Sequence, residues 1–291
     1  MTRRNWVLFL LVGFLWGIPY LFIKIAVDKE TGFSPATVVF GRVLIGAIIL
    51  IPIALRDRSI FDSIRGIKFV ALYALLEMIG PWILIGTAEQ SISSGLAGLL
   101  VASVPIWSTI ISSFYGDKTV WHKTRLFGMM IGFVGVFLLV GIESITGSSD
   151  PVAIGMILLA SIGYAWAVIM ITRALPNVSG IAINGVAMVI TGIFYAPFAI
   201  VQWPTHTIAP QAIGSVLALG VFSTGFAFAV FFKVMKEIGP TRASLVTYLN
   251  TAFAVVLGVL ILSEPLTIGI VVGLPLVLIG SYFAGRKNQT V

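Results

Sequence analysis

Ten long apolar runs divide this chain and limit what it can fold into. Each run has about 20 residues, the length that an α-helix needs to cross the hydrocarbon core of a bilayer. The connections are short, so the sequence leaves no room for a separate soluble domain. The runs cover residues 6–27, 35–55, 69–87, 92–115, 126–142, 152–172, 181–203, 213–232, 243–262 and 266–284. The sequence therefore predicts an all-α integral membrane protein with ten transmembrane helices.

Composition agrees with this prediction and excludes several kinds of site. The chain is 58% apolar and 10% charged, with a mean hydropathy of +1.08. It has no cysteine, which excludes disulfides and thiolate metal sites. Its two histidines, His122 and His206, fall in different predicted loops, and no nucleotide-binding motif is present, so no metal or other cofactor is expected. The net charge of +7 comes from short loops between apolar runs, which is not the pattern of a nucleic-acid partner.

The basic residues predict the orientation of the spans. With the ten runs as assigned, 15 lysines and arginines fall on the side of the N-terminus, against Lys29 alone on the other side. Lys24 and Arg42 fall within spans. Cytoplasmic loops of membrane proteins carry the excess of basic residues, so both termini are predicted to be cytoplasmic.

The chain also resembles itself. Residues 93–118 have a counterpart in residues 239–265, and each segment precedes a span with glycines seven residues apart. The repeat therefore covers five spans. Because five is odd, the second half enters the membrane in the opposite sense to the first, which is the inverted repeat of many secondary transporters. We expect two five-helix repeats, residues 1–147 and 148–291.

The third run carries an unusual charge. Glu77 is the one acidic residue that the assignment places inside a span, where a carboxylate costs several kcal/mol unless it is neutral, paired or facing water. Gly80–Pro81 follows closely and weakens the helix. This combination predicts a polar cavity within the bundle, and the alternative is a protonated glutamate hydrogen-bonded to a neighbouring helix. An offset of about 146 residues pairs Glu77 with Ser223, so the site has no second acid.

In a cavity, the Glu77 carboxyl has two possible functions, to bind a substrate ammonium or to carry a proton. Other polar and aromatic side chains also fall in mid-span, outside the interfacial belts where Trp and Tyr collect. Their alternative roles are packing and, for Asn250, interhelical hydrogen bonding. We interpret Arg42 as a snorkelling or paired structural residue. The predicted substrate-binding set is Trp16, Tyr73, Glu77, Met78, Pro81, Trp82, Pro105, Tyr164, Trp166, Ser223, Tyr248 and Asn250.

Several spaced motifs together resemble a known family. They are Trp16-Gly17, Lys24, Pro35 and Arg42 in the first two spans, TAEQSISSGLAGLL at 87–100, Pro105, and LILSEPLT at 260–267. In this order over two halves, they resemble the EamA branch of the drug/metabolite transporter superfamily, most closely its YddG-type amino-acid exporters of bacterial inner membranes.

The resemblance implies a basket of ten helices around a cavity formed mainly by helices 1, 3, 4, 6, 8 and 9, with helices 5 and 10 peripheral. One departure concerns the glutamate that the family usually carries after the fourth span. Here Lys118 occupies that position, preceded by Asp117, while Glu264 keeps the equivalent place in the second half.

These observations predict a multi-pass exporter of small zwitterionic metabolites, amino acids including aromatic ones, by alternating access through a central cavity. The expected partners are a small-molecule substrate and the lipid bilayer, with the chain a monomer or weak homodimer. An exporter of apolar drugs or lipids is the alternative. A membrane-embedded enzyme is disfavoured, since the sequence shows no paired carboxylates, metal ligands or Ser/His/Asp set. The Gly128–Gly132 pair on the fifth span is expected to mark helix packing or a dimer surface.

Overall fold

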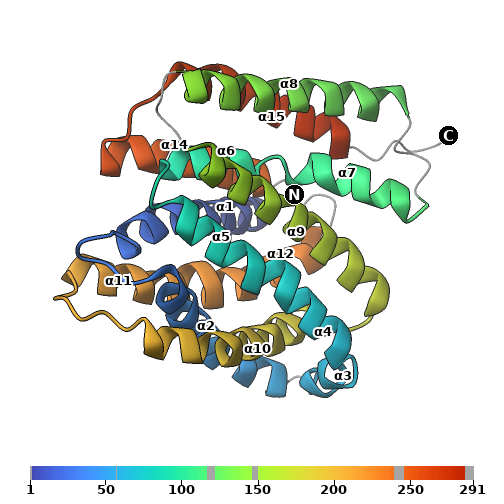
Figure 1. Ribbon diagram of the computed structural model, residues 1–291. Coiled ribbons are helices and arrows are strands. Elements are labelled where there is room, and N and C mark those ends of the chain that lie inside the picture. The colour runs from blue at the N-terminus through green and yellow to red at the C-terminus, as the bar shows by residue number, and fades with distance from the viewer. Residues whose placement is uncertain (1, 57, 117–121, 146–149, 239–245, 286–291) are drawn as a thin grey trace.

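The computed structural model of the protein describes residues 2–56, 58–116, 122–145, 150–238 and 246–285, and in these residues the chain is helical and contains no strand (Figure 1). The helices are α1 (Arg3–Ala26), α2 (Pro35–Arg56), α3 (Ile60–Arg65), α4 (Ile67–Ala74), η1 (Leu75–Ile79), α5 (Gly80–Ala88), α6 (Ser94–Val101), α7 (Val104–Phe114), α8 (Lys123–Ile145), α9 (Pro151–Ala174), α10 (Gly180–Val201), α11 (Pro210–Ala218), η3 (Leu219–Phe226), α12 (Ala227–Ile238), α14 (Val246–Leu262) and α15 (Ile268–Gly285).

Each of the ten predicted apolar runs is helical over most of its described residues. In the part of the chain that the structure describes, seven helical segments are long and apolar enough to cross a membrane, and α14 and α15 are shorter apolar helices. Ten crossings and cytoplasmic termini stay predictions. Asp117, the boundary between residues 147 and 148, and four of the basic residues used for the orientation (Lys118, Arg242, Arg286 and Lys287) lie outside the described residues.

Three of the runs are not single regular helices. The third run passes from α4 through η1 into α5, and the eighth passes from α11 through η3 into α12. Both η1 and η3 are π-helical, a form that is frequent at functional sites. The break expected at Gly80–Pro81 is instead the end of a π-turn, in which the Gly80 N–H donates to the Leu75 carbonyl. The fourth run does break, between α6 and α7 just before Pro105.

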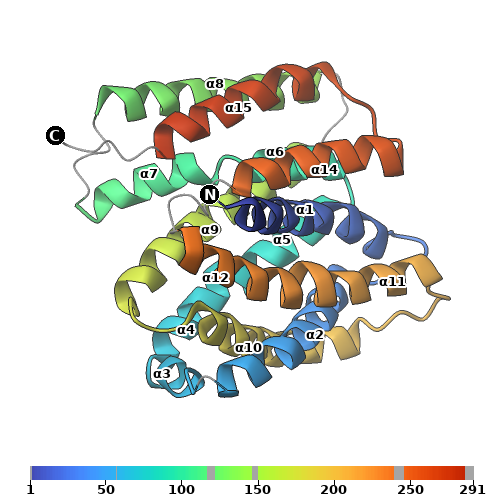
Figure 2. The ribbon, with the colours of Figure 1, turned by 180° about the vertical axis from the view of Figure 1, so that it is seen from behind.

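Helices α8 and α15 pair along one edge of the bundle, where α15 also packs against α6 and α7 (Figures 1 and 2). A Cβ atom on Gly280 of α15 would meet the backbone of Gly132 and the carbonyl of Gly128 on α8. The glycine pair of the fifth run therefore serves helix packing inside the chain.

The main contacts among the remaining helices follow a two-fold pattern. Each of them has an equivalent when every helix is replaced by the corresponding helix of the other half. Helix α1 packs against α14, and α9 packs against α6 and α7. Helix α5 packs against α9, and α1 packs in turn against α11 and α12. Helix α2 lies along α10, its counterpart in the other half. This arrangement leaves a space in the middle of the bundle for the site.

Candidate functional site

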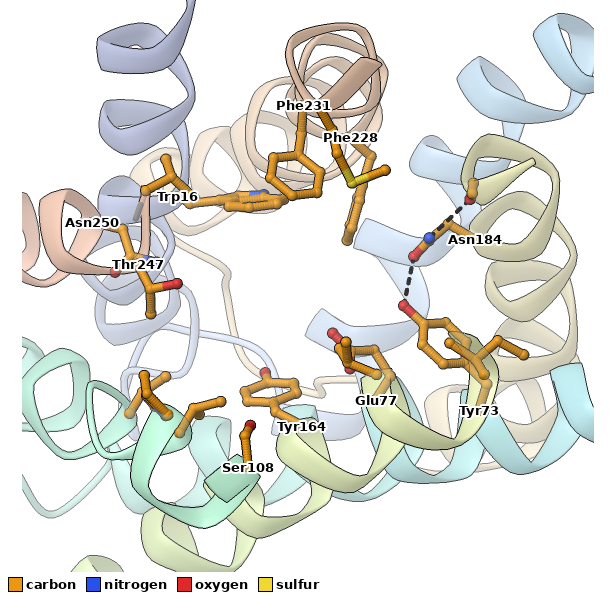
Figure 3. Close-up of a pocket in the computed structure, with 18 of the residues that line it drawn as sticks. Trp16, Tyr73, Glu77, Ser108, Tyr164, Asn184, Phe228, Phe231, Thr247 and Asn250 are labelled. Atoms are coloured by element: carbon orange, nitrogen blue, oxygen red, sulfur yellow. Dashed lines mark hydrogen bonds between the residues drawn. The ribbon is translucent and has the colours of Figure 1, made fainter. Parts of the chain in front are cut away.

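A cavity of about 930 Å³ occupies the centre of the bundle, and Figure 3 labels ten of the residues around it. The helices that the resemblance implied all contribute to it, and α2 and α10 contribute as well, through Arg42 and Asn184. The two helices expected to be peripheral, α8 and α15, each contribute one lining residue, Arg125 and Tyr282. The cavity reaches the end of the bundle where Pro176, Met235 and Val246 lie. That end carries the loops rich in basic residues. Among the described residues of the opposite loops none lines the cavity, which therefore extends toward the basic end.

Nine of the twelve predicted site residues line this cavity, and three do not. Met78 is fully buried in packing. Pro81 packs against Gly163 of α9. Trp166 is 44% exposed, and its indole N–H donates to the Tyr115 hydroxyl at 3.0 Å, outside the cavity. The nine that line it are Trp16, Tyr73, Glu77, Trp82, Pro105, Tyr164, Ser223, Tyr248 and Asn250.

Glu77 and Ser223 each bring an unpaired polar atom to the site. Glu77 lies in η1, and its Oε2 is buried without a hydrogen-bond partner. Ser223 lies in η3, and its hydroxyl is likewise buried and unpartnered. A buried polar atom without a partner costs about 1–3 kcal/mol. A bound molecule with complementary polar groups would recover that cost.

Arg42 also lines the cavity, although it was not among the predicted site residues. Its side chain is buried. The guanidinium lies 3.7 Å above the Trp82 ring, and its Nε and Nη2 donate to the Thr224 hydroxyl at 3.3 and 3.2 Å. Within the described residues no carboxylate forms an ion pair with it. The signal in the sequence is its depth in the second span, which is also consistent with a snorkelling or paired structural arginine.

Tyr164 is close enough to both Glu77 and Arg42 to interact electrostatically with each of them. Beside Glu77, the Tyr73 hydroxyl donates to Oδ1 of Asn184 at 3.2 Å, and Nδ2 of Asn184 donates to the Gly180 carbonyl at 2.9 Å (Figure 3). This wall of the cavity is therefore polar and largely hydrogen-bonded. Asn184 was not among the predicted residues.

The facing wall is aromatic. Trp16 contacts Phe231 and Phe228 with ring centroids 4.6 and 5.4 Å apart. Thr247 and Asn250 of α14 lie beside this group (Figure 3), and Oδ1 of Asn250 accepts a hydrogen bond from Thr251 at 3.3 Å. An apolar wall opposite a polar one suits a ligand that has both characters.

Backbone carbonyls at two of the helix irregularities accept hydrogen bonds from side chains. At the α6–α7 break, the Ala102 carbonyl accepts from Ser281 at 2.8 Å and the Leu100 carbonyl from Ser103 at 2.6 Å. At the π-turn, the Ile79 carbonyl accepts from the Tyr195 hydroxyl at 2.6 Å. Each of these three carbonyls therefore already has a side-chain partner.

The closed end of the bundle is held by polar contacts between the two halves and within the first. The Glu264 carboxylate, after α14, accepts from the Ser94 N–H at 2.7 Å, the Ser94 hydroxyl at 2.9 Å and the Gly95 N–H at 3.1 Å, at the N-terminus of α6. The Lys24 ammonium donates to the carbonyls of Glu89 and Ile92 at 2.6 and 2.8 Å. These contacts tie α1, α5, α6 and α14 together beyond the cavity.

The model of the EamA-like transporter family matches residues 4–141 and again residues 151–286. The chain belongs to this family. Because the homologues of this EamA-like chain are named as transporters, they point to a membrane transporter rather than an enzyme, and the protein is a multi-pass membrane protein.

The relatives are similar over nearly their whole length. An uncharacterized transporter of Archaeoglobus fulgidus is 24% identical over 288 residues, which are 98% of this chain and 100% of the relative. The uncharacterized inner membrane transporter YedA of Escherichia coli K12 is 26% identical, over 94% and 90% of the two chains. A crystal structure with 15% identity superposes with a TM-score of 0.65 over 98% of this chain and 97% of that one, which supports the fold.

Proposed function

We propose that this EamA-like chain is a secondary exporter of amino acids, including aromatic ones, that works by alternating access between two inverted five-helix repeats. The observation that carries the proposal is that Arg42 and Glu77, which do not form an ion pair with each other, line the same cavity. A guanidinium without a counter-ion and a carboxyl with an unpartnered oxygen are complementary to the carboxylate and ammonium of a zwitterion.

The aromatic wall supports a substrate with a large side chain. Trp16, Phe228 and Phe231 offer area for an apolar or aromatic group, with Trp82 on the opposite side beneath Arg42. A cavity of about 930 Å³ falls in the usual range for small-molecule sites and accommodates any amino acid with some water. An apolar drug or lipid would leave both ionisable groups buried and unpaired, which is costly, so it is the weaker candidate.

The contacts between helices support the inverted repeats. Exchange of the two halves maps the α1–α14 contact onto the α9–α6 contact, and it maps α8 onto its partner α15. With the basic loops in the cytoplasm, the cavity is open to the cytoplasm and closed at the opposite surface, the state in which an exporter loads its substrate. The relative named as an inner membrane transporter supports the same location for this chain in a bacterial inner membrane.

Counterflow in proteoliposomes tests the proposal. Efflux-driven uptake of labelled phenylalanine is measured against three competitors, namely phenylalanine, N-acetylphenylalanine without the ammonium and phenylalaninamide without the carboxylate. We expect each derivative to compete about tenfold more weakly in the wild type, the change that about 1.4 kcal/mol produces. Absence of exchange for all 20 amino acids, or equal competition by the three compounds, would refute the proposal.

Two variants assign the charges. Glu77→Gln is expected to reduce selectively the discrimination against N-acetylphenylalanine, and Arg42→Gln the discrimination against phenylalaninamide. If Glu77 carries a proton instead, Glu77→Gln leaves gradient-free exchange intact and removes only its response to a pH gradient. Glu237→Gln, which changes a surface partner of Arg4, is the matched control and is expected to behave as wild type.

A further inference from the structure

Glu89 is a second buried acid, and the cavity does not use it. It follows α5 directly, just beyond the span that ends at Ala88. Its exposed fraction is zero, and neither carboxylate oxygen has a hydrogen-bond partner. An ionised carboxylate in that position would carry the full penalty of desolvation. An apolar side chain of similar size would pack in this position at least as well as a carboxyl that forms no hydrogen bond.

Four ionisable groups face Glu89 from the surrounding elements. Lys24 and Tyr20 belong to α1, Arg42 to α2, and Glu264 to the segment after α14. Burial is the largest influence and raises the pKa of Glu89 well above its ordinary value, and Glu264 acts in the same direction. Lys24 and Arg42 oppose it. The Lys24 ammonium is engaged by two backbone carbonyls and Arg42 by Trp82 and Thr224, so neither forms an ion pair with Glu89.

The position of Glu89 links it to the closure of the bundle. Glu89 lies among the contacts that tie α1 and α5 together at the closed end, because the Lys24 ammonium donates a hydrogen bond to the backbone carbonyl of Glu89. Tyr20 and Arg42, which line the cavity, are also within electrostatic range of Glu89. Glu89 therefore lies between the closed end and the substrate cavity. Any motion that opens this end to water exposes the carboxyl beside Lys24, where it ionises readily.

We propose that Glu89 is the site at which the carrier binds a proton when the end of the bundle opposite the basic loops closes. The proton comes from water at that surface and neutralises the carboxylate, and no other bond is made or broken. Loss of the proton favours reopening. Because the proton enters and leaves at the same surface, Glu89 makes the closure of this end depend on pH, and in the proposed exporter function, on which this interpretation rests, a low pH at that surface favours the state that loads substrate.

The test follows from the absence of cysteine in the chain. Val27 is buried at the closed end of α1, so Val27→Cys reacts with a membrane-impermeant maleimide only when that end opens. Lys29→Cys, exposed on the adjacent loop, corrects for the intrinsic pH dependence of the reagent. The corrected labelling rate is expected to rise roughly threefold or more between about pH 5.5 and about pH 8.5, because the group binds its proton more tightly in the closed state.

Variants of Glu89 decide the assignment. Glu89→Gln is expected to show slow, pH-independent labelling, and Glu89→Asp to restore the pH dependence. Glu264→Gln raises the labelling rate but keeps its pH dependence, because Glu89 is intact. The proposal would be overturned if the corrected labelling rate did not depend on pH with Glu89 and Glu264 intact, or if it still depended on pH in Glu89→Gln. It would also be overturned if Glu264→Gln, and not Glu89→Gln, removed the pH dependence.

The labelling experiment needs no substrate, so it remains decisive if the amino-acid proposal fails. If both proposals hold, the dependence of amino-acid exchange on the pH at that surface is lost in Glu89→Gln. If amino acids are not exchanged but labelling follows pH through Glu89, the proton site stands and the substrate assignment falls. Melting temperature and elution volume of each variant establish that it is folded.

Discussion

Glu77 and Ser223 lie 146 residues apart, yet each lies in a π-helical turn and each brings a buried, unpartnered oxygen to the same cavity. The π-turns occupy corresponding places in the two halves. One carries an acid and the other a hydroxyl, so the two sides of the site differ in charge although their backbones match. Since unpartnered buried oxygens lower stability, ligand binding explains their presence better than folding does.

The first prediction concerns the Ser223 hydroxyl. Because it has no partner in the protein, Ser223→Ala should leave the melting temperature unchanged or raise it. If the substrate bonds to this hydroxyl, the apparent KM for phenylalanine rises roughly three- to tenfold, the value of one hydrogen bond. Thr191→Val is the control, since Thr191 is buried away from the cavity and donates to the Ala187 carbonyl at 2.8 Å. Thr191→Val should lower the melting temperature and leave the apparent KM unchanged. A lower melting temperature with an unchanged KM in Ser223→Ala would exclude substrate binding by Ser223.

The second prediction compares two tryptophans. Trp82 supports the Arg42 guanidinium by a cation–π contact that is worth about 2 kcal/mol when desolvated. Loss of about that energy in Trp82→Leu should raise the apparent KM for amino acids roughly tenfold or more and reduce the discrimination against phenylalaninamide. Trp82→Phe should keep most of the affinity and most of the discrimination, because its ring can still contact the guanidinium. Trp166→Leu should leave both unchanged, because Trp166 lies outside the cavity. Equal losses from Trp82→Leu and Trp166→Leu would contradict the assignment.

The third prediction concerns the α8–α15 pair. A methyl group on Gly280 would meet the backbone of Gly132, which cannot move without separating the helices. Gly280→Ala should cost about 1–3 kcal/mol of stability, as overpacking usually does, and lower the melting temperature. Gly155→Ala is the matched control because nothing lies within 4 Å of the added Cβ atom. Its expected effect is neutral or slightly stabilising, and similar losses in both variants would remove the packing explanation.

The sequence predicted the helices well because apolar length alone determines where a chain can cross a bilayer. It also predicted that Glu77 faces a cavity, since an unpaired carboxylate at that depth has few alternatives. Trp166 was wrongly placed for a reason visible in the sequence. It follows Tyr164 by two residues, so on one helix the two side chains point about 200° apart.

Arg42 and Glu89 were beyond local reasoning. The environment of Arg42 is made by Trp82 and Thr224, which come from distant parts of the chain. Glu89 follows its span directly and was read as a loop residue, whereas packing of α1 and α5 buries it completely. The π-turn before Gly80 likewise replaced the expected break, with the Tyr195 hydroxyl of α10 bonded to the Ile79 carbonyl.

The fourth prediction tests orientation. If the 15 basic residues on one side set the topology, a reporter fused after Lys287 reports the cytoplasm. One inserted near Ser148 reports the opposite side, because five spans precede it. Paired fusions that are active in only one compartment each, such as a fluorescent protein and a phosphatase, check both positions. A cytoplasmic signal at Ser148 would contradict the odd-numbered repeat and the inverted architecture.

The last prediction concerns Glu264, which joins the two halves at the closed end. Its carboxylate accepts three hydrogen bonds at the N-terminus of α6, where the helix dipole also favours a negative charge. Glu264→Ala should cost about 2 kcal/mol of stability and increase maleimide labelling of Val27→Cys, because the contact exists only when this end is closed. Glu237→Ala removes an exposed ion pair with Arg4 at 3.6 Å, and its cost should stay below about 1 kcal/mol.

Gly258 provides a second route to the same contact. A methyl group there would meet Oε2 of Glu264 and the Ser94 hydroxyl, so Gly258→Ala should displace the carboxylate. If its cost arises through Glu264, Gly258→Ala adds little in the Glu264→Ala background, and the double-mutant cycle gives a coupling energy of about 1 kcal/mol or more. Additive losses would mean that Gly258 acts through packing alone. Unchanged labelling in Glu264→Ala would show that this carboxylate stabilises α6 without holding the end of the bundle closed.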